Sequence, residues 1–285
     1  NTDSLVENVH FNDITICPVD LGWKAVVSNI SDLLSSGSKK TIGITISLIL
    51  PAKTEWFWVE ELYKGINKAL KKYGGIILGG DCSKGDQKAI SITAFGLQGE
   101  LELRRNACQP GDIILTTGIH GLSKLGFLIR NKIHFDNDIS LNERLINKSI
   151  EHFCRPKVYP NFLKNLLKTR SNKKIKRIGC TDSSDGLFQA LKDLASASKC
   201  KAIMNYEKIP KDKDWPKGDK WDEYYFFGGE DYELVFSLPK KWATNLTRLD
   251  KNINAIGYFT NGEPTVKFRE KKKDILLKNS PFKHF

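Results

Sequence analysis

Paired cysteines and long hydrophobic segments are both missing from this chain of 285 residues. Its six cysteines are scattered, with no CxxC pair, so neither a disulfide scaffold nor a structural zinc site is expected. The longest apolar stretch, residues 42–50, is much shorter than the roughly 18–20 residues that cross a membrane. These absences are typical of a protein that works in the reducing cytoplasm without a membrane anchor.

Motifs of several common enzyme classes are also absent. No Gly-x-x-x-x-Gly-Lys-Ser/Thr sequence occurs, which excludes a P-loop, and no Ser/His/Asp or Cys/His arrangement stands out. The chain starts without Met and without a basic leader segment. We therefore expect that it begins inside a domain and that an upstream segment is missing from the sequence.

The excess of positive charge is large but dispersed. Lysine and arginine number 45 against 33 acidic residues, which gives a formal net charge of +12. The lysines lie in short groups along the chain and form no single tract, which favours solvated loops and helix faces over a nucleic-acid groove. An anionic substrate is a third interpretation of the positive charge. Because the lysines form no single tract, no nucleic-acid partner is expected.

Alternating helical and strand patterns predict an α/β (α+β) protein of two domains, residues 1–109 and 110–285. Helices are expected at 20–36, 54–73, 141–153, 161–168, 184–198 and 240–249. Strands are expected at 41–50, 76–78, 89–96, 112–117, 175–180, 201–206, 232–238 and 253–259. Thr54 and Ser184 are predicted to cap their helices. The charged segment 208–223, with its prolines and glycine, is predicted to be a surface loop.

Acidic residues gather where predicted strands end. Asp81 closes a predicted glycine turn, Asp182 and Asp185 follow a strand, and Glu230-Asp231 precedes another. Two carboxylates about 4 Å apart repel by roughly 4 kcal/mol at a dielectric near 20, so several meet only around cations. A single Asp in such a place is usually a cap or turn former. For the three aspartates together we favour a site for divalent cations and phosphate.

Four other residues have two interpretations each. Arg105 either lies in solvent or clamps a phosphate with its guanidinium group. His10 and His120 are more often structural than functional. Phe282 either docks the end of the chain onto the core or covers a ligand ring.

Five motifs, in order along nearly the whole chain, resemble thiamine-monophosphate kinases. They are residues 2–11, 20–33, 79–81, 182–187 and 228–234, and the tail 282–285 completes the pattern. The resemblance implies a fold like aminoimidazole-ribonucleotide synthetase, whose N-terminal domain pairs strands in a homodimer. It also implies direct, Mg²⁺-assisted transfer of a phosphoryl group from ATP to thiamine monophosphate, which yields thiamine diphosphate.

The resemblance assigns roles to individual positions. According to the resemblance, several Mg²⁺ ions are bound by Thr2, Asp3, Asp32, Asp81, Asp182 and Asp185. Tyr63, Gly80, Asp81, Arg105 and Ser184 contact ATP, and His10, Glu230 and Phe282 hold thiamine monophosphate. Asp81, Arg105, Asp182 and Asp185 would act electrostatically, and no acid–base catalyst is expected because the acceptor phosphate is already ionised. Asp231 is interpreted as structural.

The chain departs from the family pattern in places. The family's upstream Gly-Asp-Asp turn lies before Asn1, Cys82 stands where threonine is usual, and Ser183 replaces an apolar residue. Two alternatives stay open from the sequence. One is another enzyme of the same superfamily, such as aminoimidazole-ribonucleotide synthetase or selenophosphate synthetase. The other is a non-catalytic basic binding protein, which would not need its aspartates near one another.

Overall fold

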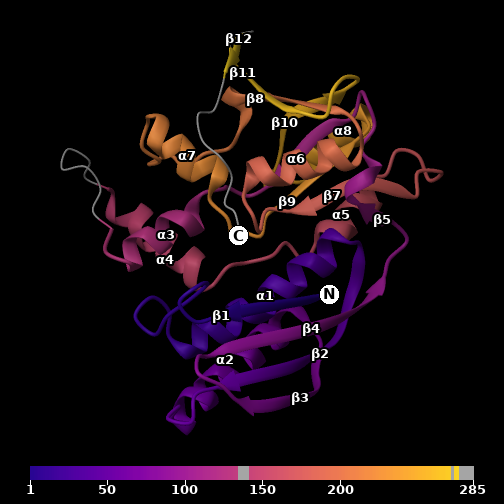
Figure 1. Ribbon diagram of the computed structural model, residues 1–285. Coiled ribbons are helices and arrows are strands. Elements are labelled where there is room, and N and C mark those ends of the chain that lie inside the picture. Colours follow the sequence, from indigo (N-terminus) through magenta and orange to yellow (C-terminus); the bar gives the residue numbers. More distant parts are fainter. Residues whose placement is uncertain (134–140, 271–272, 276–285) are drawn as a thin grey trace.

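The computed structural model describes residues 1–133, 141–270 and 273–275, which form two α/β units, each built on a mixed sheet (Figure 1). The first sheet has four strands in the order β1-β4-β2-β3, and the second has eight in the order β12-β11-β8-β10-β6-β9-β7-β5. Helix α1 lies between the small sheet and the rest of the molecule (Figure 1). The predicted two-domain α/β fold class is confirmed.

The small sheet is covered on one face by two long helices. Its strands are β1 (Thr2–Val6), β2 (Ser38–Leu50), β3 (Ile76–Lys84) and β4 (Ala89–Gln98), and its helices are α1 (Pro18–Ser35) and α2 (Trp56–Tyr73). Alternate residues of β2 and β4, such as Ile46 and Ile92, are buried in one core with Val26 of α1 and Ile66 of α2. The period of two therefore turns one face of this sheet toward the helices, as predicted for β2 and β4.

Two glycines bring α1 and α2 into backbone contact. A Cβ atom added to Gly22 of α1 would lie 2.0 Å from the carbonyl oxygen of Leu62, and one added to Gly65 of α2 would lie 1.8 Å from that of Val19. Real side chains cannot enter such spaces, because the obstructing atoms belong to the backbone. The close packing fixes α1 against the domain that carries it.

Two predictions for this domain are wrong. The residues Gly79, Gly80 and Asp81 form no turn, because β3 continues through them to Lys84 and pairs in parallel with β2. Gly80 is required there by close strand contact, since a Cβ atom would lie 2.0 Å from the carbonyl oxygen of Ile46. Thr54 does not cap α2, whose N-cap is Glu55 and has no side-chain cap.

The larger unit has helices on both faces of its sheet. Its strands are β5 (Glu102–Arg104), β6 (Ile113–Thr117), β7 (Arg177–Asp182), β8 (Lys201–Asn205), β9 (Leu234–Leu238), β10 (Ile253–Thr260), β11 (Val266–Glu270) and β12 (Lys273–Ile275). Its helices are η1 (Arg105–Ala107), α3 (Leu122–Arg130), α4 (Glu143–Cys154), α5 (Phe162–Thr169), α6 (Leu187–Ala197), η2 (Tyr206–Lys208), α7 (Asp219–Phe227) and α8 (Lys240–Leu249). The predicted helices and strands are present with shifted ends, whereas β1, β5, α3, α7, β11 and β12 were not predicted.

Alternation along each central strand separates two cores. Ile114 and Val235 pack with α3, α6 and α7, whereas their neighbours Leu115 and Phe236 pack with α5 and α8. The sheet is therefore buried on both faces, and the ends of β7 and β9 remain available for a site.

The segment 208–223 is not the predicted surface loop. Trp215 and Trp221 are buried, and their rings meet edge to face with centroids 6.1 Å apart. Asp212 is also buried and forms ion pairs with Arg144 and Lys148 of α4. Aromatic burial and these ion pairs hold the segment on the domain, although its composition resembles that of a loop.

Within the described part of the chain, no helix combines the length and apolar character that a membrane span needs. The six cysteines are unpaired, and four of them are buried. The expectation of free thiols is therefore met by the geometry.

Candidate active site

A cavity of about 350 Å³ lies between the two domains. The N-terminal domain contributes β1, the segment after it and one side of α1, and the C-terminal domain contributes α3 and the residues that follow β7 and α7. The lining residues are Asp3, Ser4, Leu5, Val9, His10, Ser28, Asp32, Lys124, Phe127, Asp182, Ser184, Asp185, Phe227, Gly229, Glu230 and Tyr232. Five predicted carboxylates thus share one cavity.

One part of the cavity is acidic. Asp3 comes from β1, Asp32 from the last turns of α1, and Asp182 from the final residue of β7. Asp182 is only 4% exposed, and it accepts hydrogen bonds from the hydroxyl groups of Ser31 at 2.6 Å and Ser184 at 3.0 Å. Carboxylates from both domains therefore meet across the cavity.

Burial destabilises the ionised forms of Asp32 and Asp182, and for Asp32 the neighbouring carboxylates add to this effect. Burial, and after it the neighbouring Asp182 and Asp3 carboxylates, raise the pKa of Asp32 to about 7, while Arg105 opposes the shift. Burial also raises the pKa of Asp182, against the hydrogen bonds from Ser31 and Ser184. A bound cation would reverse this cost, because it favours the ionised form of every carboxylate near it.

The residues fit Mg²⁺ bound together with phosphate. Within residues 1–133, 141–270 and 273–275, no three His, Cys, Asp or Glu side chains converge closely enough to hold a metal ion by themselves. Mg²⁺ keeps several waters and usually takes one or two protein carboxylates plus phosphate oxygens, so an all-protein cage is not required. Asp32 and Asp182 provide this kind of partial ligand set, and Asp185 lies at the cavity with its side chain exposed.

Arg105 lies beside the acidic cluster. It begins η1, directly after β5, and its Nε atom donates a hydrogen bond of 3.2 Å to the hydroxyl of Thr181. Its Nη1 atom is 3.6 Å from Asp193 of α6. The Arg105 side chain is 58% exposed, so the guanidinium group is anchored at one side and open to an anion at the other.

The rest of the cavity carries rings and a single carboxylate that reaches into it. His10, Phe127, Phe227 and Tyr232 line this part together with Glu230. The Nδ1 atom of His10 accepts a hydrogen bond of 3.0 Å from the backbone N–H of Val6. Glu230 forms an ion pair of 2.9 Å with Lys24. Aromatic walls with a few polar groups are typical of a site for a flat heterocycle.

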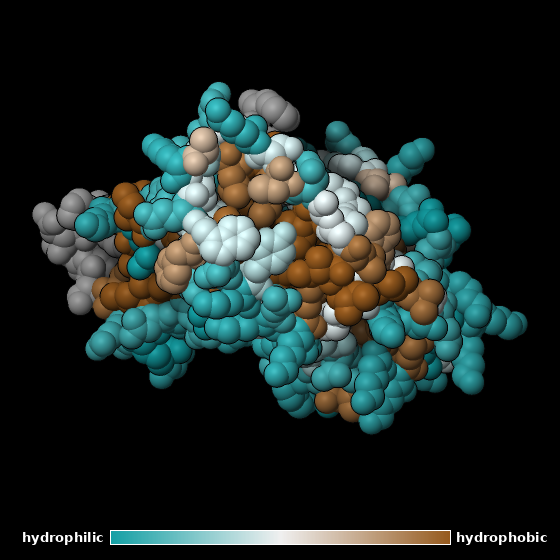
Figure 2. Space-filling view, turned by 90° about the horizontal axis from the view of Figure 1, so that it is seen from below, coloured by the Kyte–Doolittle hydropathy of each residue, from teal (hydrophilic) through white to brown (hydrophobic). Residues whose placement is uncertain are grey.

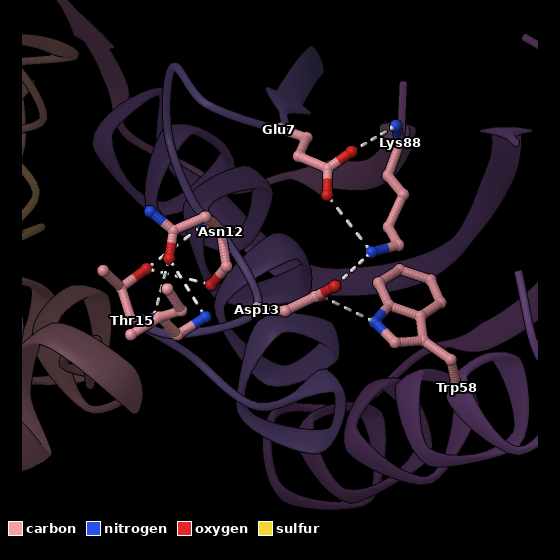
Figure 3. A network of polar contacts seen from close by, with 7 residues as sticks. Glu7, Asn12, Asp13, Thr15, Trp58 and Lys88 are labelled. Carbon is pink, nitrogen blue, oxygen red and sulfur yellow. Dashed lines mark hydrogen bonds and ion pairs between the residues drawn. The ribbon is translucent and has the colours of Figure 1, made fainter. Parts of the chain in front are cut away.

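A polar network holds the segment that carries His10. Lys88, directly before β4, forms ion pairs with Glu7 and Asp13, which precede and follow His10 in the sequence (Figure 3). Trp58 of α2 donates a hydrogen bond of 3.2 Å to Asp13, and its ring lies 5.2 Å from the Lys88 ammonium. The loop between β1 and α1 is thereby tied to the sheet and to α2.

Comparison with known proteins identifies the family. The model of the AIR synthase related protein N-terminal domain matches residues 1–98, and that of the C-terminal domain matches residues 109–268. A thiamine-monophosphate kinase of Prochlorococcus marinus is 40% identical over 285 residues, which are 100% of this chain and 86% of that protein. One from Synechococcus elongatus is 32% identical over 288 residues, with the same two shares of the chains. The chain belongs to the thiamine-monophosphate kinase family.

A solved structure of this family agrees with the fold. AaThiL complexed with AMPPCP and TMP is similar with a TM-score of 0.80 and 28% identity, over 100% of this chain and 86% of that one. The fold match extends through both domains. The resemblance to thiamine-monophosphate kinases in the sequence is therefore confirmed.

The structure brings together most residues assigned from the family pattern. Asp3, Asp32, Asp182 and Asp185 lie at one cavity with Ser184, while His10 and Glu230 line the same space. Ser184 is not a helix cap, because α6 begins at Leu187 with Gly186 as its N-cap. Its hydroxyl instead binds Asp182. Phe282 lies outside the described residues.

Four other family positions lie away from the cavity in this chain. Asp81 faces the uncovered side of the small sheet, in a row of paired positions that runs through Ser47 and Ser91 to Ser4. Three strand spacings, about 14 Å in total, therefore separate Asp81 from β1. The side chain of Thr2 lies on that same uncovered side, where it is hydrogen-bonded to Thr93.

Gly80 and Tyr63 belong with Asp81 to the β3 edge of the small sheet, which is the edge opposite β1. Gly80 is in β3 beside Asp81, and Tyr63 lies on α2. Burial, and after it the nearby Cys82 of β3, raise the pKa of Tyr63. In this respect the sequence assignments form two spatial groups, one at the cavity and one across the sheet.

Several site residues were not predicted from the sequence. Lys24, Ser31, Lys124 and Phe127 look like ordinary helix residues, and only the long-range contacts of α1 and α3 reveal them. Asp231 has the predicted structural role. It is fully buried, and it accepts hydrogen bonds from the backbone N–H groups of Gly121 at 2.6 Å and Ser123 at 2.9 Å.

Proposed function

We propose that the chain transfers the γ-phosphoryl group of ATP to thiamine monophosphate, and forms thiamine diphosphate and ADP. The observation that carries this proposal is the cavity between the domains, where Asp32 and Asp182 face the same space as Glu230 and His10. One part of the space suits metal-bound phosphates, and the other suits a heterocycle. The related structure of AaThiL is complexed with AMPPCP and TMP, which supports binding of both substrates by this chain.

Mg²⁺ ions are part of the proposal. Asp3, Asp32, Asp182 and Asp185 would hold them at the cavity. Bound Mg²⁺ would neutralise phosphate charge and lower the repulsion between two anionic substrates. Ser31 and Ser184 orient Asp182 for this task through the two hydrogen bonds to its oxygens.

The chain's own residues would supply positioning and electrostatics. Arg105, anchored by Thr181, presents its guanidinium group to phosphate oxygens on the rim of the acidic cluster. His10 and Glu230 hold the organic part of the acceptor so that its phosphate points toward the aspartates. A proton-transfer catalyst is not needed, because the attacking oxygen belongs to an ionised phosphate.

A homodimer is also part of the proposal. Seven large apolar residues of the small sheet are 37–63% exposed: Ile42, Ile49, Ile76, Ile77, Leu78, Phe95 and Leu97. Figure 2 views the molecule from the side of β3, and hydrophobic side chains gather in the middle of that face. An apolar surface beside an open strand edge favours pairing with a second copy.

A second copy would also account for the outlying family positions. Tyr63, Gly80 and Asp81 lie at the edge of the sheet opposite β1, too far from Asp32 to share a ligand within one chain. We propose that they complete the ATP site of the partner subunit across the paired sheets. ATP as a substrate and unpaired thiols are consistent with a cytoplasmic location.

The decisive experiment is a direct assay with ATP, Mg²⁺ and thiamine monophosphate. The expected result is one thiamine diphosphate for each ADP formed. Asp182→Asn should lower the rate by roughly 100-fold or more, because it removes charge at the reacting phosphates. Asp214→Asn is the matched control, since Asp214 pairs with Arg144 away from the cavity and should leave the rate unchanged. ADP formation without thiamine diphosphate would refute the proposed acceptor.

A further inference from the structure

One ion pair joins the two domains beside the ring-lined part of the cavity. Lys24 of α1 has a side chain that is 1% exposed, and its Nζ atom lies 2.9 Å from Oε2 of Glu230. The same ammonium lies 4.1 Å from the centroid of the Phe153 ring. Removing an ammonium from water is costly, so its position is determined by the few groups that stabilise it there.

The backbone of Glu230 is equally constrained. Its φ angle is 66°, in a region that residues other than glycine rarely adopt, and Tyr232 two positions later has φ 54°. The N–H group of Glu230 donates a hydrogen bond of 2.7 Å to the carbonyl of Ser184. Asp231, which lies between Glu230 and Tyr232, accepts hydrogen bonds from the backbone N–H groups of Gly121 and Ser123 at the start of α3. The strap 228–233 therefore holds Glu230 in an unusual conformation that the surrounding contacts maintain.

The two oxygens of Glu230 have different environments. Oε2 is bound by Lys24, whereas no hydrogen bond from the described residues reaches Oε1. The Glu230 side chain is 28% exposed and lines the cavity. One oxygen is thus fixed by the protein and the other is available to a ligand.

We infer that Lys24 is a positioning residue for recognition of the acceptor's heterocycle, because it holds Oε2 of Glu230 and directs Oε1 toward a hydrogen-bond donor of the substrate. This inference rests on the proposed function. Thiamine monophosphate offers one strong donor in its ring system, the amino group on the pyrimidine, since the thiazolium ring has no N–H group. Glu230 therefore recognises the amino group of the pyrimidine, and Lys24 fixes the orientation of the Glu230 carboxylate.

A purely structural role of the Lys24–Glu230 ion pair would lead to a different experimental result. If Lys24 only joined the domains, its loss would lower thermal stability and affect all ligands alike. If Lys24 orients Glu230, its loss weakens binding of ligands with the amino group and leaves ATP unaffected. An acceptor analogue with hydrogen in place of the pyrimidine amino group separates these cases.

The test measures binding of thiamine monophosphate by calorimetry with Mg²⁺ and without ATP, beside the steady-state assay. Lys24→Met should raise the Kd of thiamine monophosphate about ten-fold, which corresponds to ~1.4 kcal/mol. It should leave the KM of ATP unchanged and bind the deaminated analogue as tightly as wild type does. In a Glu230→Gln background, Lys24→Met should have no further effect on the Kd.

Lys148→Met is the matched control, because Lys148 also binds a buried carboxylate, that of Asp212, in the other domain. It should lower the melting temperature without changing the Kd. If Lys24→Met fails to fold, Lys24→Gln replaces it, with the same expected loss of affinity. An unchanged Kd in the folded variant, or an equal loss with the deaminated analogue, overturns the inference. Normal binding without turnover in wild type would instead overturn the proposed function.

Discussion

The hydroxyl group of Ser31 donates a hydrogen bond of 2.6 Å to Oδ2 of Asp182, across the boundary between the two domains. Ser31 is adjacent to Asp32 in α1, and Asp182 is the last residue of β7. This single contact therefore links the two carboxylates that face each other at the acidic part of the cavity. It orients one carboxylate and sets its distance from the other.

Loss of that hydroxyl should weaken metal binding and stability together. Ser31→Ala leaves Asp182 buried with one hydrogen bond fewer, which should lower the free energy of unfolding by about 1–3 kcal/mol. It should also raise the Mg²⁺ concentration that gives half-maximal activity. Magnesium titration and thermal melts measure the two effects. Ser35→Ala, which removes a hydroxyl bonded only to the backbone of Asp32, should change neither by much.

Loss of the Lys88 ammonium should impair the loop that carries His10. Lys88→Met removes both ion pairs to Glu7 and Asp13, and we expect a higher KM for thiamine monophosphate with kcat nearly unchanged. Steady-state kinetics with each substrate varied in turn provide the measurement. Lys64→Met, on the exposed side of α2, removes an ion pair to Glu61 and serves as the control. A change confined to the KM of ATP would contradict this role.

Stability should fall with rising pH because of Glu233. Burial raises its pKa to about 7, against the hydrogen bond from Thr117. The folded state therefore keeps a proton that the unfolded state has already lost, so stability declines as pH rises from about 4.5 to about 7. Glu233→Gln removes this dependence. The stability of Glu233→Gln relative to wild type should therefore increase by roughly 3 kcal/mol between pH 5 and pH 8. Thermal melts at each pH measure this change as a growing difference in melting temperature.

The opposite pH trend would show that Glu233 is ionised in the folded protein. The control is Glu263→Gln, which changes an exposed glutamate in the turn before β11. Its difference from wild type should stay constant over the same pH range.

Mixing two inactive variants should restore activity if the proposed dimer forms. Asp81→Asn and Asp182→Asn would each inactivate every site in their own homodimers. In a mixed dimer, the site with an intact Asp182 receives an intact Asp81 from the other subunit. Random exchange should therefore recover about a quarter of wild-type activity. Activity that stays at the level of the separate variants would place both residues in the site of one chain.

Much of the secondary structure follows from local pattern, and the exceptions have identifiable physical causes. The helix α1 was predicted because its apolar residues recur at helical spacing. The strand β3 was cut short because Gly79 and Gly80 resemble turn residues, whereas Gly80 in fact permits close contact with Ile46. The helix α7 was missed because its segment is charged and follows a glycine, while the buried tryptophans that hold it pack through long-range contacts.

The site was predictable where glycines and acids stand together in the sequence. Asp182 and Glu230 were predicted in this way, and both line the cavity. Their supports were not, because Ser31 is 151 positions from Asp182 and Lys24 is 206 positions from Glu230. A lysine inside an amphipathic helix gives no local signal that its ammonium is buried. The distance of Asp81 from the cavity was equally invisible, since it depends on strand order.

The glycine contact between α1 and α2 has a mechanical consequence. Lys24, Ser31 and Asp32 all belong to α1, and Gly22 and Gly65 lock that helix against its neighbour with no room to slide. None of the three can therefore withdraw from the cavity alone. Separating the domains must break the Ser31–Asp182 and Lys24–Glu230 contacts in one movement, so the acidic part and the ring-lined part of the cavity open and close together.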